Sequence, residues 1–303
     1  MPSSFVARLR EKLLTFLRLR ERFDESAIRQ GVLLSVAYEG RDFARLEQYA
    51  FKVFSQWGED GILQYLTREV AIANRTFIEF GVEDFSESNC RFLMMKDHWQ
   101  GFVIDGSADN IRKIRGSYYF WRYELTAVEA FITRETINDL LARSGMDEDL
   151  GILSVDIDGN DYHVLNAIKG FRPRILVCEY NPTFGQERAL TVPYRADFQR
   201  TKAHHSNLYW GASLPAFRQW AKCNGYSFVG TNDAGNNAFF VRDDLMTGTL
   251  SRLAADARPT RGHFRESRDC NGRMTYLPPA EARLAIAGLP VIDLDNGGTE
   301  AVL

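Results

Sequence analysis

The sequence has few cysteines and a small net charge, and each of these features excludes a class of protein. Its four cysteines, Cys90, Cys178, Cys223 and Cys270, lie far apart in 303 residues and form no CxxC pair. This spacing argues against a structural zinc site and is typical of reduced thiols. The formal net charge is -3, so the composition gives no reason to expect nucleic-acid binding.

Long apolar segments are also missing. No run approaches the roughly 20 residues that cross a bilayer as a helix. The N-terminus lacks the short apolar core and small-residue cleavage site of a signal peptide. We therefore expect a soluble, cytoplasmic protein. The 45% of hydrophobic residues is enough for one large domain with additions.

The segment 4–23 predicts a basic amphipathic helix. Phe5, Leu9, Leu13 and Leu17 recur at steps of four, and arginine and lysine fill much of the remainder. Such a helix packs on its own domain or on a second subunit, or lies on an anionic membrane surface, and the sequence leaves these alternatives open. A second helix is expected to follow through residue 48. Residues 1–48 would then form a helical extension, which makes a homodimer a candidate assembly.

Strand-like and helix-like segments alternate in residues 49–243. Apolar runs predict strands at 75–82, 101–107, 118–125, 150–158 and 174–181, and helical segments follow the first four at 86–98, 108–114, 127–145 and 162–171. A helix at 214–225 precedes two strands, 226–233 and 236–244, which a turn joins into a hairpin.

This order predicts the fold class. Repeated strand–helix units give an α/β protein with a Rossmann-like, seven-stranded, mostly parallel sheet, helices on both faces and an antiparallel edge hairpin. Residues 244–303 are less periodic and richer in Gly, Pro and Arg. They are expected to form a C-terminal extension that wraps the domain.

Acidic and amide side chains follow the predicted strands. In an open parallel sheet, ligands bind outside the carboxyl ends of the strands, so these residues are expected to share one site. Three aspartates follow the fourth strand within six positions, and buried carboxylates are costly unless they are paired or hydrogen-bonded or bind a metal. The strand-end residues are Glu79, Gly81, Asp105, Asp156, Asp158, Asp161, Glu179 and Asn181.

The turn after the first strand does not have the glycines of a phosphate-binding loop. The segment GVEDFSES, 81–88, carries one glycine and three acids, whereas a dinucleotide site needs G-x-G-x-x-G. This disfavours the alternative of a nucleotide-sugar oxidoreductase or epimerase. Asp105 is placed to bind both ribose hydroxyls. A nucleoside with a cationic centre suits such an acidic turn, and this points to S-adenosylmethionine.

Four segments resemble a bacterial branch of the FkbM-type methyltransferases: SQWGEDGIL (55–63), IEFGVEDFSESNCRFL (78–93), LSVDIDGNDYHVL (153–165) and FRESRD (264–269). The order of elements resembles the class I SAM-dependent methyltransferases as a whole. Members of the FkbM-like branch often occur among surface-polysaccharide biosynthesis proteins. The resemblance implies O-methylation of a sugar or sugar-derived metabolite. This chain departs from it after the fourth strand, where D-I-D-G-N-D replaces the more usual D-V-E-G.

The same resemblance implies a cofactor site along the strand ends. Its residues would be Glu79 and Gly81 at the methionine end, Asn89 at the methionine carboxylate, Asp105 at the ribose, Gly106 and Ser107 near the adenine, and Leu125 and Thr126 flanking the base.

The segment SVDIDGNDY also resembles the cation-dependent catechol and caffeoyl-CoA O-methyltransferases, which read D-x-D-K-x-x-Y there. This implies Mg²⁺ or Mn²⁺ on Asp156, Glu179 and Asn181, with Asp158 as a helper, and a lowered pKa of the acceptor hydroxyl. Two alternatives stay open. Asp156 hydrogen-bonds the amino group of the cofactor without a metal, or the acids cap the next helix, for which Asp161 is the best candidate.

A reaction without a metal needs a base. The candidates are His163, which follows the acid cluster, and His204 and His205 in TKAHHSNLYWGASL (201–214), a segment expected to cover the acceptor pocket. A third overall alternative is a non-catalytic scaffold that keeps the fold and uses its N-terminal helix for assembly.

Overall fold

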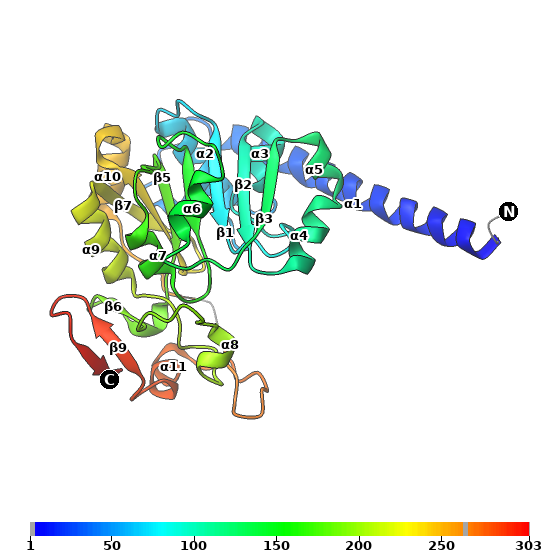
Figure 1. The fold of residues 1–303 in the computed structure, drawn as a ribbon. Helices are drawn as coiled ribbons and strands as arrows, with labels where there is room; N and C mark the ends of the chain where they lie inside the picture. The colour runs from blue at the N-terminus through cyan, green and yellow to red at the C-terminus, as the bar shows by residue number, and fades with distance from the viewer. Residues whose placement is uncertain (1–3, 263–265, 303) are drawn as a thin grey trace.

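A seven-stranded sheet forms the centre of the computed structural model, which describes residues 4–262 and 266–302, with the backbone alone for 4–18 (Figure 1). The strand order is β3-β2-β1-β4-β5-β8-β7. Its strands are β1 (Thr76–Phe80), β2 (Gln100–Asp105), β3 (Leu125–Glu129), β4 (Ile152–Val155), β5 (Ile175–Glu179), β7 (Tyr226–Thr231) and β8 (Asn237–Arg242).

The pairing of the strands confirms the predicted fold class. The five strands β3, β2, β1, β4 and β5 pair in parallel, whereas β8 runs antiparallel to both β5 and β7. The second strand of the hairpin therefore lies inside the sheet, and β7 is the edge. The chain order reverses between β1 and β4, and this switch point is where ligands bind in open α/β sheets.

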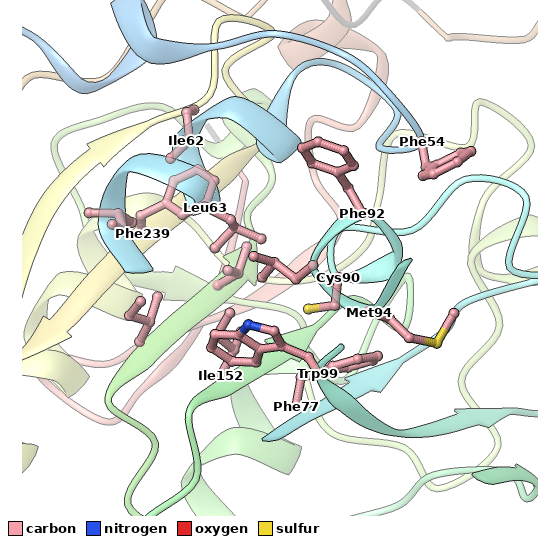
Figure 2. Close-up of a cluster of buried hydrophobic side chains, with 14 of the residues drawn as sticks. Phe54, Ile62, Leu63, Phe77, Cys90, Phe92, Met94, Trp99, Ile152 and Phe239 are labelled. Carbon is pink, nitrogen blue, oxygen red and sulfur yellow. The ribbon is translucent and has the colours of Figure 1, made fainter. Parts of the chain in front are cut away.

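Helices cover both faces of the sheet because successive strand residues point to opposite sides. Phe77 packs into the core of one face and Ile78 into that of the other. The first face carries α2 (Glu59–Glu69), α3 (Arg91–Asp97), α4 (Ala108–Arg115), α5 (Tyr118–Arg122) and α10 (Gly248–Asp256). The second carries α6 (Ile137–Ala142), α7 (Asp161–Ala167) and α9 (Leu214–Asn224). Figure 2 shows the first core, where side chains of the sheet meet Ile62, Leu63 and Phe92.

The prediction for the third strand is wrong. Residues 118–122 form the helix α5, and β3 begins only at Leu125, so the expected helix 127–145 starts with strand residues and is reduced to α6. The aromatic run favours a strand by propensity, but tertiary contacts override it. Tyr119 is buried beside Phe85 at 5.8 Å between ring centroids and under the guanidinium of Arg91 at 4.6 Å. Trp121 is 72% exposed, which does not fit a strand inside the sheet.

The N-terminal extension is one long helix, α1 (Ser4–Ala37), and it projects away from the sheet in Figure 1. The expected second helix through residue 48 is reduced to a 3-10 turn, η1 (Leu46–Tyr49). The inner end of α1 packs closely on the domain, because a Cβ on Gly31 would lie 2.5 Å from Val53 and 2.7 Å from Phe92. No helix within residues 4–262 and 266–302 is long and apolar enough to cross a membrane.

A smaller unit lies beside the sheet and has its own core. It holds an antiparallel sheet of β6 (Leu190–Thr191), β9 (Pro290–Asp293) and β10 (Thr299–Ala301). The turn η2 (Pro182–Phe184) and the helices α8 (Arg200–Ala203) and α11 (Pro279–Ala285) complete it, and η3 (Asp243–Leu245) leads into α10. Phe184, Trp210 and Ile286 are buried in its core. The sequence did not predict this second sheet, because its strands are two to four residues long.

Candidate functional site

A cavity of about 420 Å³ opens at the carboxyl ends of β1, β2, β4 and β5. Phe198, Arg200 and Glu266 of the smaller unit contribute to its wall. The predicted strand-end residues that line it are Glu79, Gly81, Asn89, Asp105, Gly106, Asp156, Asp158 and Glu179. The structure therefore brings most of the predicted site residues to one place, at the switch point of the sheet.

Glu79 orders the loop that leads into α3. Its carboxylate accepts hydrogen bonds from the backbone N–H of Asn89 at 2.7 Å, the hydroxyl of Ser88 at 2.7 Å and the backbone N–H of Cys90 at 3.2 Å. Burial raises the pKa of Glu79 to about 7. Asn89 in turn donates from Nδ2 to the hydroxyl of Ser154 at 3.0 Å. Glu79 and Asn89 thus form one fixed wall of the cavity.

Gly81 allows the turns after β1 and β4 to touch. Its φ of 66° lies in the left-handed region, and a Cβ there would lie 1.7 Å from the carbonyl oxygen of Asp156. Only glycine fits such a position, because any side chain would force the two turns apart. The single glycine of the turn after β1 is therefore required by the close contact with the turn after β4.

Asp105 lies at the end of β2 and is 8% exposed. It accepts hydrogen bonds from the N–H of Glu83 and of Ser107, each at 2.8 Å, and from Nδ2 of Asn110 at 3.1 Å. A carboxylate has about four lone-pair sites, so it can still accept a ligand hydroxyl. Ser107 itself caps α4 by accepting from the N–H of Asn110, and it is not part of the cavity wall.

The structure does not bring Leu125 and Thr126 to the cavity. Both lie at the start of β3, where they pair with Gly101 and Phe102. They are therefore at the amino ends of the strands, whereas the site is at the carboxyl ends. This correction follows from the misplaced third strand. The loop after β3, residues 130–132, takes their expected place. Its Phe131 is 49% exposed and lies 3.6 Å from where a Cβ on Gly106 would be.

Two of the three aspartates after β4 are engaged by other groups. Asp161 accepts from the N–H of Ile157 at 2.7 Å and of Gly159 at 2.8 Å, so its carboxylate holds the loop in place. Burial raises the pKa of Asp161 to about 6. Asp158 has a φ of 54° and forms an ion pair with Arg200 at 2.7 Å. The prediction that Asp161 caps the next helix is wrong, because Asp161 is the first residue of α7 and its carboxylate binds the preceding loop, while the N-cap position is Asn160.

The third aspartate, Asp156, forms a hydrogen-bonded pair with Glu179. Burial and the charges of the neighbouring aspartates raise the pKa of both groups well above the usual range. Oε2 of Glu179 is buried with no hydrogen-bond donor among the described residues. A proton held between the two carboxyl groups would supply that donor.

The donor set does not fit the expected divalent metal. Asn181 does not line the cavity, and its side-chain amide holds backbone groups, because Nδ2 donates to the carbonyls of Leu208 and Trp210 at 2.9 Å and Oδ1 accepts from Thr183 N–H. Asp158 is paired with a guanidinium. No group of three His, Cys, Asp or Glu side chains able to hold a metal ion occurs in the described part of the chain. The assignment of Asn181 as a ligand is wrong.

None of the three predicted histidine bases lines the cavity. Nε2 of His163 lies 2.8 Å from the carbonyl of Val192, and burial lowers its pKa. Nδ1 of His204 lies 2.8 Å from the hydroxyl of Ser206, and its ring lies 4.1 Å from that of His205. Helical position alone does not show which way a side chain points, so sequence reasoning misplaced these residues.

The segment SQWGEDGIL contributes Gln56 to the cavity, while its two acids support the wall from behind. Glu59 accepts from the N–H groups of Trp57 and Gly58 and from the side-chain amides of Asn232 and Asn237. Asp60 binds the backbone of residues 53–55, and burial raises its pKa to about 6. These residues organise the site without facing it.

Sequence reasoning missed Arg200 as a site residue. Its guanidinium contacts Asp158 at 2.7 Å and Glu266 at 3.3 Å, and Nε donates to the carbonyl of Asn207 at 2.8 Å. Glu266 belongs to the FRESRD segment, whose Phe264 and Arg265, like His263 before it, lie outside the described residues. Asp158 was the feature of the sequence that could have indicated Arg200, because an acid at a strand end beside other acids is stabilised by a cationic partner.

No protein-family model matches the sequence, and no curated protein matches it. Among solved structures, an S-adenosylmethionine-dependent methyltransferase from Clostridium acetobutylicum is similar at 5% identity and a TM-score of 0.39, over 61% of this chain and 90% of that one. An O-methyltransferase from Bacillus cereus in complex with SAH is similar at 11% identity and a TM-score of 0.36, over 71% of this chain and 89% of that one. A protein from Klebsiella pneumoniae described as an O-methyltransferase is similar at 10% identity and a TM-score of 0.41, over 71% of this chain and 90% of that one. At such identities and TM-scores these likenesses say nothing about activity, so function is inferred below from the cavity.

Proposed function

We propose that this chain is an S-adenosylmethionine-dependent methyltransferase that acts on a hydroxyl group of a small molecule. The observation that supports this most is the acidic cavity at the switch point of the sheet, where Gly81 closes the first turn and Asp105 ends β2. Glu83 and Glu87 line the part of the wall where a pyrophosphate would otherwise lie. The cavity therefore suits a cationic nucleoside better than a dinucleotide.

The wall residues divide between the two ends of such a ligand. Asp105 would accept from one ribose hydroxyl, and Phe131 with Gly106 would flank the adenine, in the place first assigned to Leu125 and Thr126. Glu79 and Asn89 would hold the amino-acid end. When bound, S-adenosylmethionine supplies a methyl group on a sulfonium centre.

The Asp156–Glu179 pair is the proposed base. With both groups ionised, Asp156 would take the proton of the acceptor hydroxyl, and the two carboxyl groups would then hold that proton between them. Because the pKa of the pair is raised, the pair is a better proton acceptor than an ordinary carboxylate. The wall positions the acceptor in line with the transferred group, and positioning is the main requirement of such a displacement.

The narrower assignments rest on sequence resemblance. The FkbM-like segments support a sugar or sugar-derived metabolite as the acceptor and a role in surface-polysaccharide biosynthesis. The cytoplasmic location, the homodimer and membrane contact through α1 stay predictions, as does the division at residues 48 and 243. The proposed reaction does not use Mg²⁺ or Mn²⁺, because Asn181 bonds to backbone groups and Asp158 pairs with Arg200.

Calorimetric titration with S-adenosylmethionine tests the proposal. Asp105→Asn should weaken binding at least tenfold, since one acceptor oxygen is replaced by an amide. Asp109→Asn is the matched control on the same turn, because Asp109 is an exposed residue that pairs with Arg112. Its affinity should stay within twofold of the wild type. Equal affinities for all three proteins would remove Asp105 from the site, and no binding to the wild type would refute the function.

A further inference from the structure

A second cavity, of about 430 Å³, lies in the smaller unit between η2, the segment 208–210 and the start of α11. Its wall is mainly apolar, unlike the acidic wall of the first cavity. The apolar residues that line it include Pro182, Leu208, Trp210, Leu277, Pro279 and Ala282. This volume is typical of a small-molecule site.

The two cavities are neighbours. Glu266 lines both of them, and Glu179 of the first wall is separated by one residue from Asn181 of the second. Arg200 connects the walls, because its guanidinium pairs with Glu266 at 3.3 Å and lies 4.9 Å from the centre of the Trp210 ring. The second cavity therefore meets the first at Glu266.

The polar side chains of the second cavity differ in burial. The amide of Asn181 is fully bonded to protein groups and has no remaining donor for a ligand. Gln186 and Arg261 line the cavity and are exposed, whereas Trp210 and Ala282 are buried. A bare sugar would leave most of its hydroxyls without partners against such a floor, which costs binding energy.

We propose that the second cavity binds the methyl acceptor, and that this acceptor is a hydroxylated compound with a flat apolar ring, such as a phenol. The ring lies on the floor of Leu208, Leu277 and Ala282, and the hydroxyl end passes Glu266 into the first cavity toward Asp156. This inference rests on the proposed methyltransferase function. A sugar-derived metabolite fits only if it carries such a ring.

Fluorescence titration with 4-methylumbelliferone, a fluorescent phenol, tests the inference in the full chain. Ala282→Phe fills the floor and should weaken binding of the phenol at least tenfold. The matched control is Leu284→Phe on the same helix, where the side chain is 70% exposed and affinity should stay within twofold. Because Ala282 is buried, Leu277→Gln at a half-buried position serves as a second variant and should also weaken binding at least fivefold.

Calorimetry with S-adenosylmethionine separates this inference from the proposed function. All three variants should bind the cofactor within twofold of the wild type. If the wild type binds S-adenosylmethionine but not the phenol, or if the floor variants bind the phenol as well as the wild type does, the acceptor inference is wrong and the methyltransferase proposal stands. If S-adenosylmethionine fails to bind, the proposed function itself is wrong.

Discussion

Replacing Gly81 by alanine tests whether the cavity depends on the contact between the turns after β1 and β4. The new Cβ would lie 1.7 Å from the carbonyl oxygen of Asp156, and the φ of 66° disfavours any side chain. The left-handed backbone costs ~1–2 kcal/mol. Overpacking against a fixed backbone atom adds ~1–3 kcal/mol. The free energy of unfolding should therefore fall by about 2–5 kcal/mol.

The same contact predicts a loss of cofactor binding. Separation of the two turns displaces the turn after β1, whose Glu83 N–H holds Asp105, so affinity for S-adenosylmethionine should fall at least tenfold. For the effect on stability, the matched control is Gly106→Ala in the same cavity, because its Cβ would have only an ordinary contact of 3.6 Å with Phe131. It should change stability by less than about 0.5 kcal/mol. Denaturant unfolding and calorimetry measure both effects. Wild-type stability and affinity in Gly81→Ala would refute the reasoning.

Three further predictions concern charge. The folded-state pKa of Glu79, about 7, lies above its ordinary value of 4.5. Between these pH values the native state therefore binds more protons than the unfolded state does. In the protein without ligand, ionisation of Glu79 should thus lower the free energy of unfolding by ~3 kcal/mol as the pH rises from 4.5 to 7. Urea unfolding across that range checks this; no difference between wild type and Glu79→Gln in the pH slope would contradict it. Asp156→Asn and Glu179→Gln should each lower turnover at least ~100-fold while affinity for the cofactor changes less than threefold, with exposed Asp139→Asn as the control. Turnover in EDTA should match turnover in Mg²⁺, since Asn181 and Asp158 are engaged elsewhere; a loss restored by Mg²⁺ would overturn the donor-set argument.

The sheet was predictable because its strands are short apolar runs, each followed by acids or amides. Parallel strands place their carboxyl ends at one edge, so Glu79, Asp105 and Asp156 were expected together and do line one cavity. The third strand was not predictable from propensity, because burial of Tyr119 against Arg91 favours a helix there. Because β3 lies later in the chain than predicted, Leu125 and Thr126 do not reach the site. For the same reason the sequence analysis did not identify Phe131 as a site residue.

Side-chain direction was the second limit. His163 follows the acid cluster in sequence, yet its ring faces Val192 rather than the cavity. Asn181 follows β5 as a metal ligand would, yet its amide ties down the segment 208–210. Arg200 comes from a helix of four residues in a unit that the sequence did not predict. Long-range contacts decide each of these positions, and no local pattern encodes them.

The most direct test of the central claim is a calorimetric titration of the full chain with S-adenosylmethionine and, in the same buffer, with NAD. The acidic wall with a single glycine in its first turn predicts micromolar binding of S-adenosylmethionine and no binding of NAD. Binding of NAD, or no binding of S-adenosylmethionine, would contradict the account.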